Sequence, residues 1–340
     1  MFGKRMNILA HGDRRLASRF AQEFHPRRFL PTLTAGLIVG ILAVAIRISL
    51  AALIFSGSLA AHVGSGIGLM LFGVCIMSIV GALTSSQPST IIGPQDAPTA
   101  ILALIAATLT QRMAASATTE TIFYTLVAAI ALSSLLSGIF FFTMGRLKLG
   151  RLIRFAPYPV VGGFLAGTGW LLVQGAIGVM AGVPLSFAQL PYLLQAAVLE
   201  QWLPGVIFAL LLLVLLRRYT HVLLMPAMVV GAIGLFYAFL WLTHTSVAQA
   251  GTRGWLLQAL PAGALWQPLV PAALARANWP AIVGQMDKIG TILLISMISL
   301  LLNVSGLELA VRQDLDLDRE LQVAGIANLV AGLGGSPVGY

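Results

Sequence analysis

The stretch STIIGPQDAPTA, residues 89–100, interrupts strongly apolar sequence with two prolines, a glycine and one carboxylate. The β-branched residues before Gly93-Pro94 favour extended backbone. Asp96 then stands where an N-cap would stand, and Pro98 falls in the first turn of the helix that follows. The pattern therefore predicts a helix that begins inside an apolar region after a non-helical approach.

The sequence around this break has the composition of a membrane protein. Of the 340 residues, 58% are hydrophobic and 9% are charged, and the mean hydropathy is +0.93, whereas soluble domains carry roughly 25% charged residues. A helix needs about 20 apolar residues to cross a bilayer. The apolar stretches predict an all-α polytopic membrane protein with spans at about 30–55, 66–85, 97–111, 120–144, 157–181, 202–217, 221–242, 283–309 and 320–334.

The basic residues gather in short segments between these spans. A net charge of +9 and a pI of about 10.4 would favour nucleic-acid binding in a soluble protein, but here the positions of the charges follow the positive-inside rule. We therefore expect no nucleic-acid partner, a cytoplasmic N-terminus, and a multi-pass protein in the lipid bilayer of a bacterial-type inner (plasma) membrane. The segments assigned to the cytoplasm contain Lys4, Arg5, Arg14, Arg15, Arg19, Arg27, Arg28, Arg146, Lys148, Arg151, Arg154, Arg217, Arg218, Arg312 and Arg319.

The order of elements repeats along the chain. A long span, a second span and the break GPQDAP are matched by the last two spans and a second break, GGSPVGY, residues 334–340. Paired interrupted segments in two inverted halves indicate the binding site of a secondary transporter. The expected organisation is a basic cytoplasmic segment (1–28), a first inverted repeat of helices 1–7 (29–242), an extracytoplasmic connection (243–281) and the beginning of a second repeat, helices 8–9 and the start of helix 10 (282–340).

Non-helical backbone at membrane depth persists only where protein or a water-filled cavity surrounds it. A half-helix that begins there directs its free N–H groups and the positive end of its dipole into the cavity, where they attract anions. Asp96 is either a cap for these N–H groups or a carboxylate that exchanges H+ or binds Na+ during transport, and the two roles are compatible. The substrate-binding candidates at the break are Gly93, Pro94, Gln95, Asp96 and Ala97.

Three segments resemble motifs of the sulfate permease (SulP) family of inorganic anion transporters. GPQDAPTAILAL (93–104) looks like the family's Gly-Pro opening of helix three. RFAPYPVVGGFLAGTG (154–169) is similar to its Pro-Tyr-Pro-Val-x-x-Gly-Phe-x-x-Gly signature. DRELQVAGIANLVAGLGGSPVGY (318–340) resembles its Asn-Arg-Glu-Leu segment and the Gly-Gly-x-Pro turn after it. The likeness covers nearly the whole chain from about residue 28.

The resemblance implies a fold of seven plus seven inverted-repeat helices with a core and a gate domain. The substrate would lie between the facing N-termini of helices three and ten, and the core would move like an elevator against the gate. Family members usually carry a cytoplasmic STAS domain, and a homodimer is expected. By this comparison the sequence is an N-terminal fragment of the transmembrane domain, truncated at the start of the tenth helix.

Two positions depart from the family pattern. Arg47-Ile48 aligns with the family's Pro-Gln in helix one, and these two residues are further substrate-binding candidates. A buried arginine needs a partner, so Arg47 is expected to attract the anion or to pair with Asp96 or Glu308; alternatively it snorkels or faces the domain interface. Gln95-Asp96 adds a carboxylate beside the anion site, which argues against a simple sulfate-like selectivity.

The end of the eighth span holds the candidates for ion coupling. Family members place an acidic residue there, and Glu308, with Ser305 nearby, is the match in this chain. Together with Asp96 these residues are the expected partners of a coupling H+ or Na+. The alternative for Glu308 is a hydrated position at the cytoplasmic interface.

These observations predict a secondary active transporter of a small anion of the sulfate, bicarbonate or dicarboxylate class. Two alternatives remain: a non-transporting sensor or inactive remnant, and a carrier of nucleobases or amino acids on the same fold. The sequence has no His-Glu-x-x-His or Gly-x-Ser-x-Gly motif, and its five histidines show no metal-ligand spacing. We therefore expect no enzyme, no metal site and no cofactor apart from a coupling ion.

Overall fold

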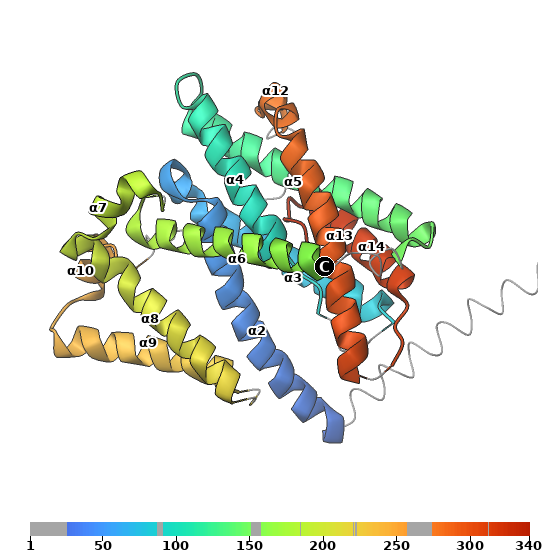
Figure 1. Ribbon diagram of the computed structural model, residues 1–340, viewed down its shortest axis with the longest axis horizontal. Helices are drawn as coiled ribbons and strands as arrows, with labels where there is room; N and C mark the ends of the chain where they lie inside the picture. The colour runs from blue at the N-terminus through green and yellow to red at the C-terminus, as the bar shows by residue number, and fades with distance from the viewer. Residues whose placement is uncertain are drawn as a thin grey trace, which may run out of the picture. The chain divides into compact units, whose positions relative to one another are not determined.

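The chain folds into long helices, and no strand occurs among the residues that the structure describes. The computed structural model describes residues 26–86, 91–150, 158–183, 185–219, 221, 223–256, 274–311 and 313–340. The long helices are α2 (Pro26–Ile54), α3 (Val63–Thr84), α4 (Asp96–Met113), α5 (Thr119–Arg146), α6 (Tyr158–Ala181), α8 (Ala196–Arg218), α9 (Leu224–Leu242), α13 (Met286–Val311) and α14 (Leu317–Leu333). Each expected span corresponds to one of them (Figure 1).

Short helices connect these spans. They are η1 (Gly57–His62), η3 (Phe187–Gln189), α7 (Leu190–Leu193), α10 (Val247–Thr252) and α12 (Trp279–Val283). By contacts, the chain divides into two units, Met1–Ile46 and Arg47–Tyr340. The second unit contains the end of α2 and all later helices. The domain boundaries expected at residues 28, 242 and 281 stay a prediction.

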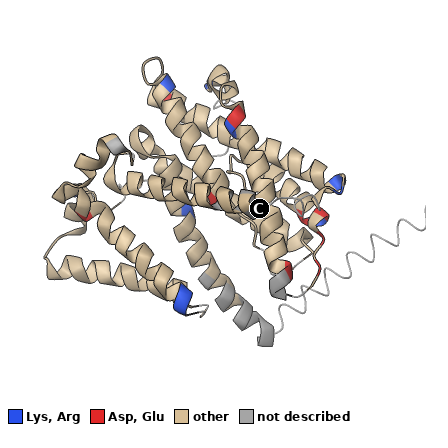
Figure 2. Cartoon of the chain, in the orientation of Figure 1, with Lys and Arg blue, Asp and Glu red and all other residues tan. Residues whose placement is uncertain are grey.

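The helices have the length and polarity of membrane spans. Five described segments are long and apolar enough to cross a bilayer: Gly57–Thr84, Thr119–Arg146, Ala196–Arg218, Leu224–Leu242 and Met286–Glu308. Most charged residues in the described part lie at helix ends and in loops (Figure 2). The break shortens α4 to 18 residues, as the sequence predicts. The chain is a multi-pass membrane protein.

Helices α3, α4, α5, α13 and α14 pack around one apolar core, together with the end of α2. The contact between α14 and α5 is close because small residues face each other there. A Cβ on Gly325 would lie 2.6 Å from the backbone nitrogen of Phe142 and 2.9 Å from the carbonyl oxygen of Gly138. In contrast, only 6% of the most apolar 18-residue segment is buried in α8, and the same holds for α9. These two helices therefore present most of their apolar surface outside the core.

Polar contacts tie the N-terminus of α14 to the ends of α3 and α5. The carboxylate of Glu320, which is 3% exposed, accepts hydrogen bonds from the Ser85 hydroxyl (3.0 Å) and from the Ser86 N–H (2.9 Å) and hydroxyl (2.6 Å). Arg319 donates to the carbonyl oxygen of Thr84 (3.0 Å). The Gly150 N–H, after α5, donates to Asp318 (2.8 Å). Loops assigned to the cytoplasm by their basic residues thus meet at one end of the bundle.

The Glu320 contacts predict a large effect on stability. Glu320→Ala removes the buried carboxylate that accepts hydrogen bonds from Ser85 and Ser86, and losing hydrogen bonds to a charged group costs about 2–3 kcal/mol. We expect a lower midpoint of thermal unfolding in detergent. The control is Glu200→Ala, because Glu200 is exposed on α8. Equal midpoints for the two variants would contradict the role assigned to Glu320.

Candidate functional site

The two breaks in the sequence meet in the structure. Pro94 and Gly339 form an isolated antiparallel bridge. The Gln95 N–H donates to the carbonyl oxygen of Val338 (3.2 Å), and the Tyr340 N–H donates to that of Gly93 (3.3 Å). We call this meeting of residues 91–95 and 336–340 the crossing. It lets two extended segments inside a helical bundle satisfy backbone groups that would otherwise be buried without partners.

Helix α4 begins at the crossing. Its N-cap is Gln95, not Asp96 as the sequence predicted, and the Gln95 side chain makes no cap hydrogen bond. The bridge holds the backbone of Gln95 extended. The side-chain Nε2 of Gln95 donates instead to the carbonyl oxygen of Tyr340 (2.8 Å). Asp96 is therefore the first helical residue. Its Oδ1 accepts from the Ala97 N–H (2.9 Å), so Asp96 still satisfies one free donor of the helix start.

Asp96 and Ala97 have opposite surroundings. Asp96 is exposed, while Ala97 is 4% exposed and belongs to the packed interior. The apolar side chains Met77, Ile92, Val323, Ala327 and Ala331 form a separate cluster beside the first break. The carboxylate thus faces away from the packed side, where a ligand can reach it.

Arg47 lies beside the first break, on α2. Its Nη2 is 3.0 Å from the position that a Cβ on Gly93 would occupy, and Arg47 is 9% exposed. Its Nε has no hydrogen-bond partner among the described residues. The charge of Asp96 acts on the guanidinium, but no carboxylate of the described residues lies within 4.0 Å of it. The expected ion pairs with Asp96 and Glu308 are therefore not made here. Neighbouring Ile48 packs against the apolar core.

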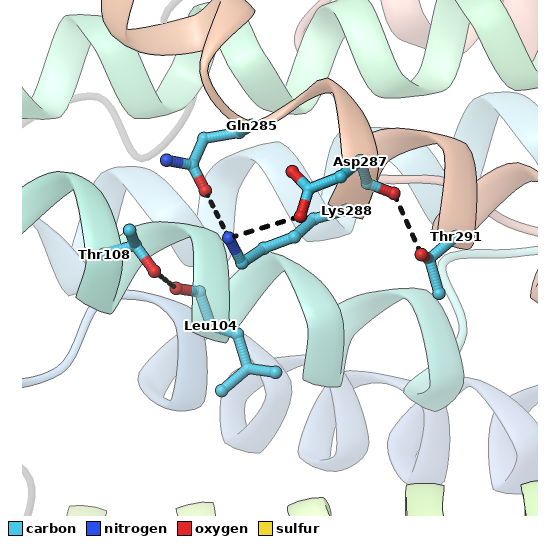
Figure 3. A network of polar contacts seen from close by, with 6 residues as sticks. All are labelled: Leu104, Thr108, Gln285, Asp287, Lys288 and Thr291. Carbon is cyan, nitrogen blue, oxygen red and sulfur yellow. Dashed lines mark hydrogen bonds and ion pairs between the residues drawn. The ribbon is translucent and has the colours of Figure 1, made fainter.

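Lys288, in contrast to Arg47, has polar partners. At the start of α13 its ammonium group lies 2.8 Å from Oε1 of Gln285 and 3.9 Å from the carboxylate of Asp287 (Figure 3). Twelve residues, or about 18 Å of helix at ~1.5 Å per residue, separate Asp287 from Ser299, whose side chain contacts Tyr340 of the crossing. The Lys288 cluster is therefore not part of the same site.

The structure adds residues that the sequence did not single out. The Tyr340 hydroxyl interacts with the side chain of Ser299 on α13, and the Ser78 hydroxyl on α3 donates to the carbonyl oxygen of Ile92 (2.9 Å). The side-chain amide of Asn328 on α14 contacts the backbone of Gly339. Asn328 carries the signal that could have identified it, since it is a lone amide in the apolar sequence AGIANLVAG, residues 324–332.

The structure does not bring the other coupling candidates to the crossing. Glu308 lies near the end of α13, and its Oε1 accepts from the Leu315 N–H (2.9 Å). It is nine residues from Ser299, about 14 Å along the helix at ~1.5 Å per residue. Ser305 is half-buried on the same segment. A coupling role for Glu308 and Ser305 stays a prediction.

A cavity of about 340 Å³ borders α4 on the side of α6. Along α4 it extends from Ala100, one turn after Asp96, to Gln111 near the end of the helix. Its other walls include Leu53 and Ile54 of α2 and Gln174 of α6. Among the described residues no three His, Cys, Asp or Glu side chains are placed to hold a metal ion.

Comparisons with known proteins agree with this architecture. The chain is 24% identical over 323 residues to the vacuolar basic amino acid transporter VSB1 of Saccharomyces cerevisiae, covering 92% of this chain and 31% of that protein. It is 29% identical over 110 residues to the bicarbonate transporter BicA of Picosynechococcus sp., covering 32% of this chain and 18% of that protein. The chain thus spans about a third of the length of the yeast relative.

The fold has a counterpart among solved structures. The transmembrane domain of a cyanobacterium bicarbonate transporter BicA superposes with a TM-score of 0.60 at 20% identity, covering 93% of this chain and 74% of that chain. The predicted all-α inverted-repeat membrane fold is confirmed. The model of the sulfate permease family matches residues 29–340, and the chain belongs to that family.

Proposed function

We propose that this chain forms the transmembrane part of a secondary active transporter that binds a small anion at the crossing. The observation that carries the proposal is Arg47, a residue that is 9% exposed and whose buried Nε has no hydrogen-bond partner among the described residues. It lies beside the break from which the 18-residue helix α4 begins. A buried charge without a counter-charge is costly, and a bound anion supplies that counter-charge.

We propose that the cavity beside α4 is the route to this site. It starts one turn from Asp96 and follows α4 toward the end that the charge distribution assigns to the extracytoplasmic side. An elevator-type movement of α3–α5, α13 and α14 relative to α6, α8 and α9 would expose the crossing to each side in turn. Coupling to H+ or Na+, assembly as a homodimer, and an inner (plasma) membrane location with the N-terminus in the cytoplasm belong to the same proposal.

Uptake measurements test the anion proposal. The full-length protein is reconstituted in liposomes and given labelled sulfate, bicarbonate and dicarboxylates, with inward Na+ or H+ gradients applied separately. We expect saturable uptake of at least one anion and competition by the others that share its charge and size. Binding without flux would favour a sensor, and the absence of both would overturn the proposal.

Cysteine labelling tests the access route. In a Cys75→Ser background, we expect a cysteine at Ala103, which lines the cavity, to react with a membrane-impermeant maleimide added from outside. A transported anion should slow the reaction by at least about threefold. The proposed reason is that an anion bound at the crossing moves α3–α5, α13 and α14 relative to α6, α8 and α9. A cysteine at Ala128, which is 2% exposed in the core, is the control. Equal reactivity at both positions would rule out this route.

A second candidate function has a specific observation in its favour. Asp96 is an exposed carboxylate at the start of α4, and Arg47 of α2 lies beside the preceding break, so the site offers both signs of charge. The yeast relative, named as a transporter of basic amino acids, aligns with 92% of this chain. An amino acid would place its carboxylate near Arg47 and its ammonium group near Asp96. Uptake of arginine or lysine that Asp96→Asn abolishes would favour this candidate over an inorganic anion.

A further inference from the structure

Asn328 contacts the second break, at Gly339, on the side that faces away from Pro94 and the first break. It lies on α14 and is fully buried, with 0% of its surface exposed. Its Nδ2 donates to the carbonyl oxygen of Gly339 (2.6 Å), and its Oδ1 accepts from the N–H of the same residue (3.0 Å). One side-chain amide therefore satisfies both backbone groups of Gly339, as a neighbouring strand would do.

The surroundings of Asn328 permit only one orientation of its amide. Nδ2 faces a second carbonyl oxygen, that of Ala324 (2.7 Å). The hydroxyl of Ser134 on α5 donates toward the carbonyl oxygen (3.2 Å) and Oδ1 (3.4 Å) of Asn328. An amide offers two donors on one atom and acceptor sites on the other, and reversing it would place donor against donor and acceptor against acceptor. We call the paired contact between the Asn328 amide and the Gly339 backbone the clamp. Ser134 connects α5 to it.

Gly339 is enclosed on both sides. Pro94 forms the bridge with it, the Asn328 amide lies on its other side, and a Cβ on Gly339 would lie 2.5 Å from Sδ of Met77. Residue 340 follows directly, and its backbone contacts Gly93 and Gln95 at the start of α4. The position of Asn328 thereby determines where the second break stands relative to the first.

A corresponding contact holds the first break. The Ser78 hydroxyl on α3 donates to the carbonyl oxygen of Ile92 (2.9 Å), so each break is held by a polar side chain of the helix that precedes it. The two contacts differ in strength. Ser78 makes one hydrogen bond to one carbonyl group, whereas Asn328 makes two to a single residue and two more within its own surroundings.

We propose that Asn328 is the positioning residue of the substrate site: its amide sets the distance between the second break and the start of α4, and Ser134 fixes its orientation. This inference rests on the proposed function, because it assigns binding to the crossing. Asn328 itself does not touch the substrate. Its effect on binding is transmitted through Gly339 and Tyr340.

The test is Asn328→Asp, which keeps the shape but replaces the two Nδ2 donors. The ionised carboxyl group repels the carbonyl oxygens of Gly339 and Ala324, whereas the protonated group donates to one of them. We expect the KM for uptake to rise about tenfold relative to wild type at neutral pH, and the ratio of variant to wild-type KM to fall toward one as the pH is lowered. Vmax per folded protein should change much less.

Two neighbouring serines give a matched control. Ser133 and Ser134 are both fully buried on α5, but the Ser133 hydroxyl donates to Ala129 of its own helix (2.7 Å). Ser134→Ala should therefore raise KM in the same direction as Asn328→Asp, though less, and Ser133→Ala should not. A KM that is unchanged in Asn328→Asp, or that rises equally in both serine variants, overturns the proposal.

Hydrogen exchange of residues 336–340 separates this proposal from the proposed function. In the full-length protein, the amides of this segment should lose protection in Asn328→Asp at neutral pH and regain it, relative to wild type, in acid. If wild type transports none of the anions, the proposed function fails. The exchange result alone then tests whether Asn328 positions residues 336–340. Protection that is the same in variant and wild type at both pH values overturns it.

Discussion

Arg47→Gln is expected to reduce anion uptake, measured as kcat/KM, by about 30- to 150-fold. Arg47 lies beside the crossing and its Nε has no hydrogen-bond partner among the described residues, and a charge-assisted contact to a bound anion contributes about 2–3 kcal/mol in a site of this kind. Flux of the transported anion into liposomes, with protein amount matched, gives the measurement. Arg47→Lys keeps the charge but loses the planar fork, so we expect intermediate uptake.

The stability of the Arg47 variant distinguishes a functional from a structural role. Removing a buried charge that has no partner relieves its desolvation cost, so Arg47→Gln should unfold at the same temperature as wild type or higher. A structural arginine would give the opposite result, a lower unfolding temperature together with reduced uptake. Full uptake by Arg47→Gln would refute the assignment of Arg47 to the substrate site.

Gly339→Ala is expected to abolish uptake and destabilise the crossing. A Cβ at this position would collide with the carbonyl oxygen of Gly93 and approach its carbonyl carbon to 2.5 Å. Both atoms belong to backbone that the bridge holds in place, so the strain cannot be relieved by rotating a side chain. Overpacking of this kind costs about 1–3 kcal/mol or more.

The matched variant for this prediction is Gly234→Ala on α9. No atom of the described residues lies within 4 Å of a Cβ at Gly234, and Ala is the better helix former. Uptake and thermal unfolding of Gly234→Ala should equal those of wild type. If Gly339→Ala transports as well as Gly234→Ala, the crossing is not required in this form during transport.

The sequence determined the helices and the position of the first break. Each of the nine apolar stretches corresponds to a long helix in the described part of the chain. The bilayer, as a solvent, requires sufficient length and low polarity of every span, and both can be read from the local sequence. Gly93-Pro94 was recognisable for a similar reason, since glycine and proline act on their own backbone. The second break, at residues 334–340, was identified because it repeats the order of the first.

Other features depended on residues that are distant in the chain. The N-cap of α4 is Gln95 and not the predicted Asp96, because the bridge between Pro94 and Gly339 holds Gln95 extended. Glu308, one expected partner of Arg47, accepts a hydrogen bond from the Leu315 N–H near the end of α13 instead. No local pattern contains such information, because it arises from the relative placement of the helices.

The same distinction applies within the substrate site. The sequence indicated that residues 93–97 and 334–340 belong together, because both interrupt apolar spans at corresponding places. Only the tertiary structure decided that the Asn328 amide binds both backbone groups of Gly339 and that Nε of Arg47 has no hydrogen-bond partner among the described residues. Hydrogen-bond geometry is fixed to tenths of an ångström by the packing of α3, α5 and α14, whereas hydropathy and breaks specify only which segments cross the membrane and where they are interrupted.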